Sequence, residues 1–273
     1  MDTSSIRNVV VIGTGIMGPG IALGYAAGGR QVTIVARTEE SAARGRDSVE
    51  GFLQALEEEG LFSPRDSALT LDKLDTSTDL ESAVRDADLV VESIVERLET
   101  KRALFARLDS ICRPETILAS NTSGLRITEI AAGMSRPERA ATTHYWNPSH
   151  LMPLVEIVKG ERTSQETVEL LHALLTEIGK RPAMVRKDVP GQLGNRIFHA
   201  IRREAMYIVQ EGIATAEEVD MAVKMGFGLR FPVHGPLEHA DLNGLEMSLA
   251  IHSYIVGDLC RDPEPVAILR KKV

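Results

Sequence analysis

The chain has 273 residues, of which 43% are hydrophobic and 26% are charged, the balance of a globular protein with a sizeable core. Its net charge of -8 and isoelectric point of about 5.5 do not favour binding to a polyanion, so we expect no nucleic acid and no membrane among its partners. The two cysteines, Cys112 and Cys260, lack the spacing of a metal site, which predicts reduced thiols and no bound metal. The first residues pass into a strand pattern without the features of a signal peptide, so we expect a cytoplasmic protein.

Short apolar runs alternate with amphipathic segments over the first two thirds of the chain. In chain order, this alternation predicts strand 8–12, helix 16–27, strand 32–36 and helix 39–59. It continues with strand 88–94, helix 98–111, strands 116–121, 139–146 and 154–158, helix 163–178 and strand 182–186. Such alternation predicts an α/β fold with a Rossmann-type, doubly wound and mostly parallel sheet that carries helices on both faces.

The pattern changes in the segment KDVPGQLGNR, 187–196, after which no strand pattern follows. The spacing of Ile, Leu, Met and Val then predicts helices at 197–210, 215–224 and 236–256. We therefore expect a dinucleotide-binding domain over 1–187 and an all-helical domain over 188–273. A small helical domain cannot bury all of its apolar surface alone, which favours a homodimer formed through this second domain.

The stretch VVVIGTGIMGPGIA carries three glycines in GxGxxG spacing between the first strand and the first helix. In this position glycines permit a tight turn and a close approach of the backbone to a pyrophosphate, which the free N–H groups of the helix then bind. The alternative is a glycine-rich turn that holds no ligand. The residues expected at the dinucleotide are Gly13, Thr14, Gly15, Ile16, Met17 and Gly18.

The second predicted strand ends in Ala36, Arg37 and Thr38, where a dinucleotide-binding fold usually places an acid that binds the adenosine ribose. Alanine removes the repulsion that such an acid exerts on a 2′-phosphate. Arg37 can bind that phosphate and stack on adenine, and Thr38 can add a hydroxyl. These residues favour NADP as the cofactor, whereas in the alternative Arg37 only covers the adenine of NAD.

Three sequence blocks resemble the 3-hydroxyacyl-CoA dehydrogenase family, and the resemblance covers nearly the whole chain. The blocks are DADLVVESIVERLETKRALFARLDSICRPETILASNTSGLRITEIA, HYWNPSHLMPLVEIV and KDVPGQLGNR. The resemblance implies a Rossmann-type domain followed by a helical domain that forms the dimer. It also implies an enzyme that transfers a hydride between a nicotinamide cofactor and the 3-hydroxy or 3-oxo carbon of a substrate.

Carried over residue by residue, the family pattern places the catalytic histidine at His144 and its carboxylate partner at Glu156. Histidine suits this chemistry because its proton exchanges near neutral pH, and a carboxylate orients the ring and stabilises the imidazolium. Ser123 and Asn195 match the residues that bind the reacting oxygen. The residues implied beside the nicotinamide are Glu96, Lys101 and Asn121. Taken singly, each of these residues also has a structural explanation, such as an outward-facing strand residue or a helix cap.

The chain departs from the CoA-using members of the family at several places. Those members have Asp where Ala36 stands, HFFNP where this chain has HYWNP, and a lysine near CoA where this chain has the acidic stretch GFLQALEEEG, 51–60. They also continue into a tail rich in Gly, Lys and aromatic residues, whereas this sequence ends at AILRKKV. The chain is therefore similar to the branch with carnitine, gulonate and pyridoxine-catabolic dehydrogenases.

The substrate classes that remain open are a free 3-hydroxy acid and a 3-hydroxyacyl-CoA. The alternative to an enzyme is a non-catalytic, crystallin-like protein that binds a dinucleotide.

Overall fold

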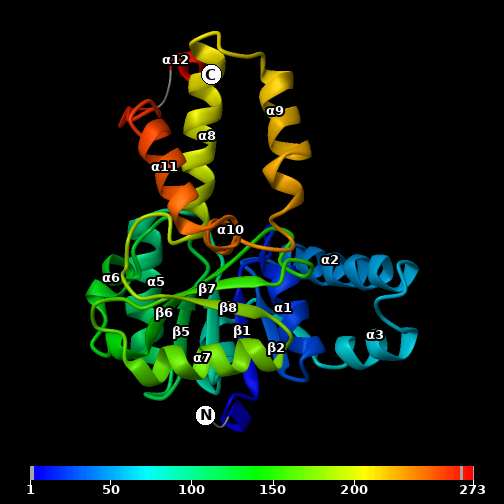
Figure 1. The fold of residues 1–273 in the computed structure, drawn as a ribbon. Helices are drawn as coiled ribbons and strands as arrows, with labels where there is room; N and C mark the ends of the chain where they lie inside the picture. Colours follow the sequence, from blue (N-terminus) through cyan, green and yellow to red (C-terminus); the bar gives the residue numbers. More distant parts are fainter. Residues whose placement is uncertain (1–2, 265–266, 273) are drawn as a thin grey trace. The chain divides into compact units, whose positions relative to one another are not determined.

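The computed structural model describes residues 3–264 and 267–272, and it divides into two compact units, Met1–Leu193 and Gly194–Val273 (Figure 1). The first unit is built on a sheet, and the second contains helices. The two units are described separately below.

The sheet of the first unit has eight strands in the order β3-β2-β1-β4-β5-β6-β7-β8. Neighbouring strands are parallel except for β6 and β7, which are antiparallel. This arrangement confirms the predicted Rossmann-type, mostly parallel sheet. The strands are β1 (Asn8–Ile12), β2 (Gln31–Val35), β3 (Leu74–Ser77), β4 (Leu89–Glu92), β5 (Ile117–Ser120), β6 (Ala140–Tyr145), β7 (Leu154–Val158) and β8 (Arg181–Val185).

Helices cover both faces of this sheet because its central strands are apolar on both sides, as in β1 and β5. Residues of α1 (Gly18–Ala27), α2 (Glu39–Glu58) and α7 (Gln165–Glu177) pack into one core cluster with one face of the strands. Residues of α4 (Leu80–Arg85), α5 (Leu98–Ile111) and α6 (Ile127–Ile130) pack into a second cluster on the other face. The carboxyl ends of the parallel strands meet at one edge, where ligands of such folds bind.

The segment between α2 and β4 contains three elements that the sequence patterns did not predict: α3 (Pro64–Leu71), β3 and α4. The strand β3, with the sequence LDTS, is short and polar at three of its four positions, as is typical of a strand at the edge of a sheet. The helix α4 spans only six residues, too few to display a helical period. The first predicted helix begins at Gly18, two residues late, because the glycine turn occupies the preceding positions.

The second unit contains helices, as the sequence predicted. The expected single helix over 236–256 is wrong, because Gly244 adopts a φ of +88° and interrupts it. That conformation favours glycine and ends an α-helix. The helices are α8 (Gly194–Gln210), α9 (Ala216–Met225), α10 (Pro236–Asn243), α11 (Leu245–Ile255) and α12 (Ala267–Lys272). Within 3–264 and 267–272, no helix has both the length and the apolar character needed to cross a bilayer.

Candidate active site

Two glycines of the turn between β1 and α1 are needed for close approaches of the backbone, and a third faces open space. A Cβ at Gly18 would lie 1.9 Å from the carbonyl oxygen of Gly13, so only glycine lets the helix begin this close to the turn. Gly13 has a φ of +116°, and a Cβ there would lie 2.4 Å from the carbonyl oxygen of Ser93. A Cβ at Gly15 would meet no atom within 4 Å, so the turn leaves open space at this residue.

The N-terminus of α1 is suited to an anion. Its N-cap residue, Met17, forms no side-chain cap, and the first turn carries no acidic side chain. The free N–H groups and the helix dipole therefore favour a bound negative charge. A pyrophosphate fits this turn because Gly15 offers the space and α1 offers the donors.

The end of β2 carries the residues expected at the adenosine ribose. Ala36 is buried, and its N–H donates to the carbonyl oxygen of Ser77 over 2.9 Å. The side chain of Arg37 is exposed and forms no hydrogen bond or ion pair with any other described residue. Thr38 caps α2, since its hydroxyl accepts a hydrogen bond from the N–H of Ser41. The hydroxyl of Thr38 is thus already used by the helix that it begins.

A row of polar side chains follows one face of the sheet, on the side of α5 and α6. Strand pairing places Glu92 beside Ser120 on neighbouring strands, and pairs His144 with Glu156 across β6 and β7. Because side chains alternate along a strand, these four share the face on which Val90, Leu118 and Ala140 pack. The sheet register therefore brings together residues that lie up to 64 positions apart in the sequence.

His144 and Glu156 form a buried pair. The Nδ1 atom of His144 lies 2.7 Å from Oε2 of Glu156, and the residues are 5% and 0% exposed. The other carboxylate oxygen, Oε1, accepts a hydrogen bond from the N–H of Leu193 over 2.8 Å. Because a carboxylate accepts hydrogen bonds, Nδ1 carries the proton and Nε2 of the neutral ring is left to exchange one. This geometry is that of a base oriented by a carboxylate.

A buried ion network lies beside this pair along the sheet. Lys101 on α5 is fully buried, and its Nζ donates to Oε1 of Glu92 over 2.6 Å and lies 3.3 Å from Oε2 of Glu96. Glu92 also accepts hydrogen bonds from the hydroxyl of Ser120 and the N–H of Ile94. Lys101 thus fixes Glu96 from the interior of the protein.

Glu96 in turn holds the loop that follows β5. Its Oε1 atom accepts hydrogen bonds from the Thr122 hydroxyl, the Ser123 N–H and the Gly124 N–H, the last two over 2.9 and 3.1 Å. Partial burial raises the pKa of Glu96, but the hydrogen bond from Thr122 and the charge of Lys101 outweigh it, so the pKa lies below its usual value. Glu96 is therefore a carboxylate that orders the backbone around the exposed Ser123.

Asn121 and Asn195 are the other two residues that the sequence predicted at the site. The amide of Asn121 joins strands, because its Nδ2 donates to the Ser93 hydroxyl over 3.2 Å and its Oδ1 accepts from the Tyr145 N–H over 2.9 Å. Asn195 is the second residue of α8 in the second unit.

Sequence reasoning missed several residues of this site: Glu92, Ser120, Trp146 and the backbone of Leu193. Glu92 had a usable signal, because a glutamate at the end of the apolar strand LVVE must be paired when buried. The contact of Trp146 with Glu156 depends on side-chain direction, which strand patterns do not report.

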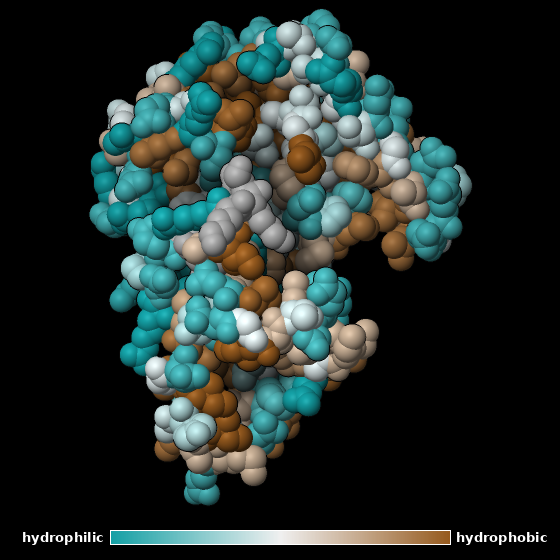
Figure 2. All heavy atoms as spheres, turned by 90° about the horizontal axis from the view of Figure 1, so that it is seen from above, coloured by the Kyte–Doolittle hydropathy of each residue, from teal (hydrophilic) through white to brown (hydrophobic). Residues whose placement is uncertain are grey.

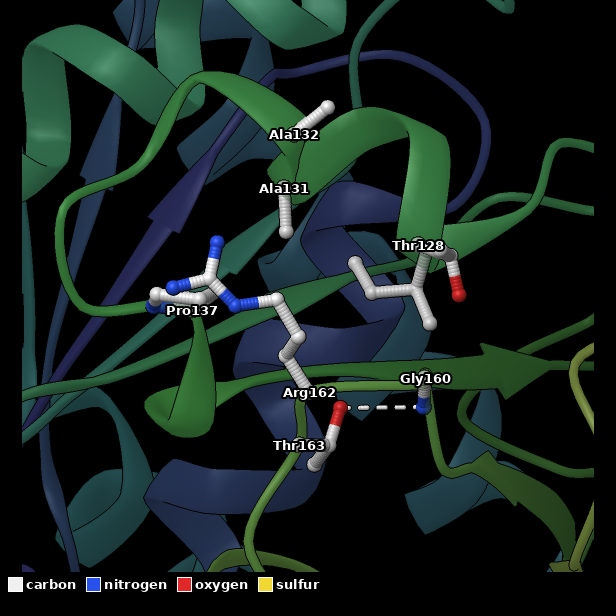
Figure 3. Close-up of a pocket in the computed structure, with 8 residues that line it drawn as sticks. Thr128, Ala131, Ala132, Pro137, Gly160, Arg162 and Thr163 are labelled. Carbon is white, nitrogen blue, oxygen red and sulfur yellow. Dashed lines mark hydrogen bonds between the residues drawn. The ribbon is translucent and has the colours of Figure 1, made fainter.

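A small pocket of the first unit shares none of these residues. It is lined by α6, the turn at Pro137 and the segment after β7, and Figure 3 shows the side chain of Arg162 extending across it toward Pro137. Thr163 also lines it, and its hydroxyl accepts a hydrogen bond from the Gly160 N–H over 2.9 Å. Among the described residues, no group of three His, Cys, Asp or Glu side chains is arranged to hold a metal ion.

Comparisons with known proteins identify the family of the chain. The model of the 3-hydroxyacyl-CoA dehydrogenase NAD-binding domain matches residues 8–189, and the model of the C-terminal domain of the same enzymes matches residues 191–273. A 5-formyl-3-hydroxy-2-methylpyridine 4-carboxylate 5-dehydrogenase from Mesorhizobium japonicum is 36% identical over 267 residues, or 97% of this chain and 85% of the relative. The mitochondrial hydroxyacyl-coenzyme A dehydrogenase of Rattus norvegicus is 41% identical over 246 residues, or 88% and 77% of the two chains.

A solved structure extends the similarity to three dimensions. The crystal structure of a 5-formyl-3-hydroxy-2-methylpyridine 4-carboxylic acid 5-dehydrogenase, described as an NAD+-dependent dismutase, is 34% identical. Its TM-score is 0.90, and the match covers 98% of this chain and 85% of that chain. The family models together span nearly all of the sequence, and so the chain belongs to the 3-hydroxyacyl-CoA dehydrogenase family, as an enzyme with an NAD-binding domain.

Proposed function

We propose that the protein transfers a hydride between a nicotinamide dinucleotide and the 3-hydroxy or 3-oxo carbon of a small substrate, with His144 and Glu156 as the acid–base pair. The observation that carries this proposal is the 2.7 Å contact between His144 Nδ1 and Glu156 Oε2, at one end of a buried polar row. This contact holds the imidazole in the tautomer that leaves Nε2 ready to accept a proton.

The chemistry divides between the cofactor and the chain. A bound dinucleotide would supply the hydride acceptor for oxidation of the substrate carbon and the hydride donor for the reverse reaction. As the carbon loses its hydride, Nε2 of His144 takes the hydroxyl proton, and the buried Glu156 carboxylate stabilises the resulting imidazolium. In the reverse direction, the same imidazolium returns the proton to the oxygen.

The remaining residues orient the reactants. We propose that Ser123 donates a hydrogen bond to the reacting oxygen, which polarises the carbonyl form, and the family pattern implies Asn195 as a further donor. Glu96 and Asn121 are the residues that would hold the nicotinamide side of a bound cofactor. Lys101 acts through Glu96, because its ammonium group is fully buried between two carboxylates.

We also propose that the cofactor pocket binds NADP more tightly than NAD. The support comes from the absence of an acid at Ala36 and from the exposed, unpaired guanidinium of Arg37 within the described part of the chain. Two acids, Glu39 and Glu40, stand in the first turn of α2, and they oppose a 2′-phosphate. The preference is therefore small, of about tenfold, which corresponds to roughly 1.4 kcal/mol.

We propose a compact free 3-hydroxy acid as the substrate in place of a CoA ester. The support is the acidic end of α2, where Glu57, Glu58 and Glu59 follow one another. Like charges about 4 Å apart repel by roughly 1 kcal/mol in water and by more at a protein surface, so this segment would not anchor the CoA phosphates. A further support is the relative that is 36% identical and named a 5-formyl-3-hydroxy-2-methylpyridine 4-carboxylate 5-dehydrogenase, because the substrate in that name carries no CoA.

We further propose a homodimer formed through the second unit, in the cytoplasm. The described helices α8, α9, α10 and α11 contain no buried residue, and Leu237 and Tyr254 are 81% and 89% exposed. Figure 2 shows apolar side chains gathered at the surface of the molecule among hydrophilic ones. Exposed apolar side chains that gather in this way are typical of a protein–protein interface. Light scattering at micromolar concentration tests the assembly, and a monomer mass would contradict it.

The function is tested by a panel of free 3-hydroxy acids and 3-hydroxyacyl-CoA esters, each with NAD and with NADP. Reduction of the dinucleotide is followed by its absorbance. We expect turnover with at least one free acid at a higher kcat/KM than with any CoA ester. Efficiency near 10⁵ M⁻¹s⁻¹ or above for a CoA ester, which is usual for a natural substrate, would contradict the proposed substrate class. Dinucleotide binding without turnover of any compound would favour a crystallin-like role.

A further inference from the structure

Trp146 contacts the same carboxylate oxygen as the histidine. Its indole Nε1 donates a hydrogen bond to Oε2 of Glu156 over 3.1 Å, while His144 Nδ1 lies 2.7 Å from that oxygen. The two rings lie 5.7 Å apart between centroids at an angle of 54°. Oε2 of Glu156 thus contacts two side chains, that of His144 on β6 and that of Trp146 directly after β6.

We propose that Trp146 is a positioning residue: by donating to the oxygen that Glu156 shares with His144, it fixes the carboxylate and weakens that carboxylate's hold on the imidazolium. This inference rests on the proposed acid–base pair and adds a residue to it. Its basis is the shared oxygen, which gives the indole N–H a direct effect on the group that orients the histidine.

The physical argument follows from the burial of Glu156, whose residue is 0% exposed. A buried carboxylate needs several donors, because hydrogen bonds are the only replacement for the water that it has lost. An indole N–H on Oε2 and the Leu193 N–H on Oε1 hold the plane of the carboxylate from both ends. The indole also draws negative charge away from Oε2, so less of that charge is left to stabilise a protonated His144.

The other ionisable groups of the neighbouring strands do not compete for this role. The phenol of Tyr145 points to the opposite face of the sheet, where it hydrogen-bonds to the phenol of Tyr25 over 2.8 Å. Burial raises the pKa of both phenols, so they remain neutral. Across β7 from Glu156, the paired residue of β8 is Ala183.

The charged groups on the side of β4 and α5 form their own network. Glu92 is balanced by Lys101 and by the Ser120 hydroxyl, and Glu96 is balanced by Lys101 and the Thr122 hydroxyl. A substitution at Trp146 leaves all of these contacts in place. A change in proton exchange at His144 in such a variant is therefore assigned to the lost indole donor.

The decisive variant is Trp146→Phe, which keeps an aromatic ring and removes the N–H. Activity of the reaction in the oxidation direction rises with pH as His144 loses its proton, and this acid limb is measured in kcat/KM. We expect the limb to move to higher pH by about 0.5–1 unit in the variant, because the carboxylate then holds the imidazolium more firmly. Tyr145→Phe, which removes a neighbouring hydroxyl that does not contact Glu156, is the matched control and should not move the limb.

A second measurement uses the wild-type protein and does not depend on turnover. Trp146 is the single tryptophan of the chain, so its fluorescence reports this contact alone. A protonated imidazole quenches a neighbouring indole, so we expect the emission to fall as pH decreases, with a midpoint at the acid limb of the wild type. His144→Gln should abolish this change.

The results distinguish a failure of the role proposed for Trp146 from a failure of the proposed acid–base pair. Acid limbs that superimpose for the wild type and Trp146→Phe would overturn the role of Trp146. An emission titration that is the same in the wild type and in His144→Gln would also overturn it. Full activity in His144→Gln together with a His144-dependent emission change would instead contradict the acid–base pair and leave the contact established. If Trp146→Phe unfolds, the emission titration of the wild type still decides whether protonation of His144 changes the fluorescence of the indole.

Discussion

Lys101 and Glu92 form an ion pair in which both side chains are 0% exposed, with 2.6 Å between Nζ and Oε1. The pair joins α5 to the carboxyl end of β4, and the same ammonium group lies 3.3 Å from Glu96. Two carboxylates of different exposure thus depend on one buried cation.

Replacing Lys101 by Met should strongly destabilise the protein, because it leaves the Glu92 carboxylate buried without its counter-charge. Breaking a buried pair in this way costs about 3–5 kcal/mol of the free energy of unfolding. Urea unfolding followed by circular dichroism measures the loss. The double variant Glu92→Gln, Lys101→Met should recover part of it, whereas Glu99→Gln on the exposed face of α5 should change little. Equal free energies of unfolding for Lys101→Met and the wild type would show that the buried Glu92 carboxylate does not depend on the charge of Lys101.

The contribution of Glu96 to stability should depend on pH. Its pKa in the folded protein lies below the ordinary value of 4.5, so the folded state favours the charged form. The stabilisation is therefore fully present above pH 4.5 and is lost as pH falls through the lower, folded pKa. The difference in unfolding midpoint between the wild type and Glu96→Gln should be larger at neutral pH than in acid. A difference that grows on acidification would show that the sign is wrong.

Two glycines of the same turn should respond differently to alanine. Gly18→Ala brings a Cβ to 1.9 Å from a carbonyl oxygen and should destabilise the fold by about 1–3 kcal/mol or more. Gly15→Ala meets no atom of the protein and should leave the melting temperature nearly unchanged. Its methyl group would instead occupy the space proposed for the pyrophosphate and raise the Kd of the dinucleotide about tenfold or more. Calorimetric titration measures this Kd, and unaltered binding in Gly15→Ala would place the dinucleotide elsewhere.

Cofactor choice should follow residues 36 and 37. Arg37→Ala should remove the tighter binding of NADPH relative to NADH, because the 2′-phosphate loses its cation. Ala36→Asp should go further and reverse the preference, since a carboxylate there repels that phosphate and binds the ribose hydroxyls. Both Kd values are obtained by fluorescence titration of the reduced dinucleotides. Tighter NADH binding in the parent protein would assign Arg37 to the adenine ring instead.

The sequence predicted the parts of the fold that rest on local patterns. The apolar runs of β1, β2 and β5 and the glycine turn are readable because burial on both faces and backbone geometry each demand particular residue types. The polar edge strand β3 lacks such a demand, and it was missed. The break at Gly244 was missed too, because apolar residues occur on both sides of it, at Leu242 and Leu245, and a single glycine does not by itself end a helical pattern.

The candidate site was predictable to a similar degree. His144 and Glu156 followed from family motifs, and the antiparallel register of β6 and β7 pairs them directly. The buried Glu92 and the indole of Trp146 were not predicted, because their roles depend on which side chains meet across strands and helices. Spacing along one strand carries no information about such contacts.

The most direct test of the central claim is the steady-state rate of His144→Ala with a substrate and cofactor found in the panel. The matched control is His172→Ala, which removes an exposed histidine on α7. Loss of the general base should lower kcat by about two orders of magnitude or more while the Kd of the dinucleotide stays within twofold, and the control should keep the parent rate. A His144→Ala enzyme that turns over at the parent rate would contradict the assignment of the acid–base pair.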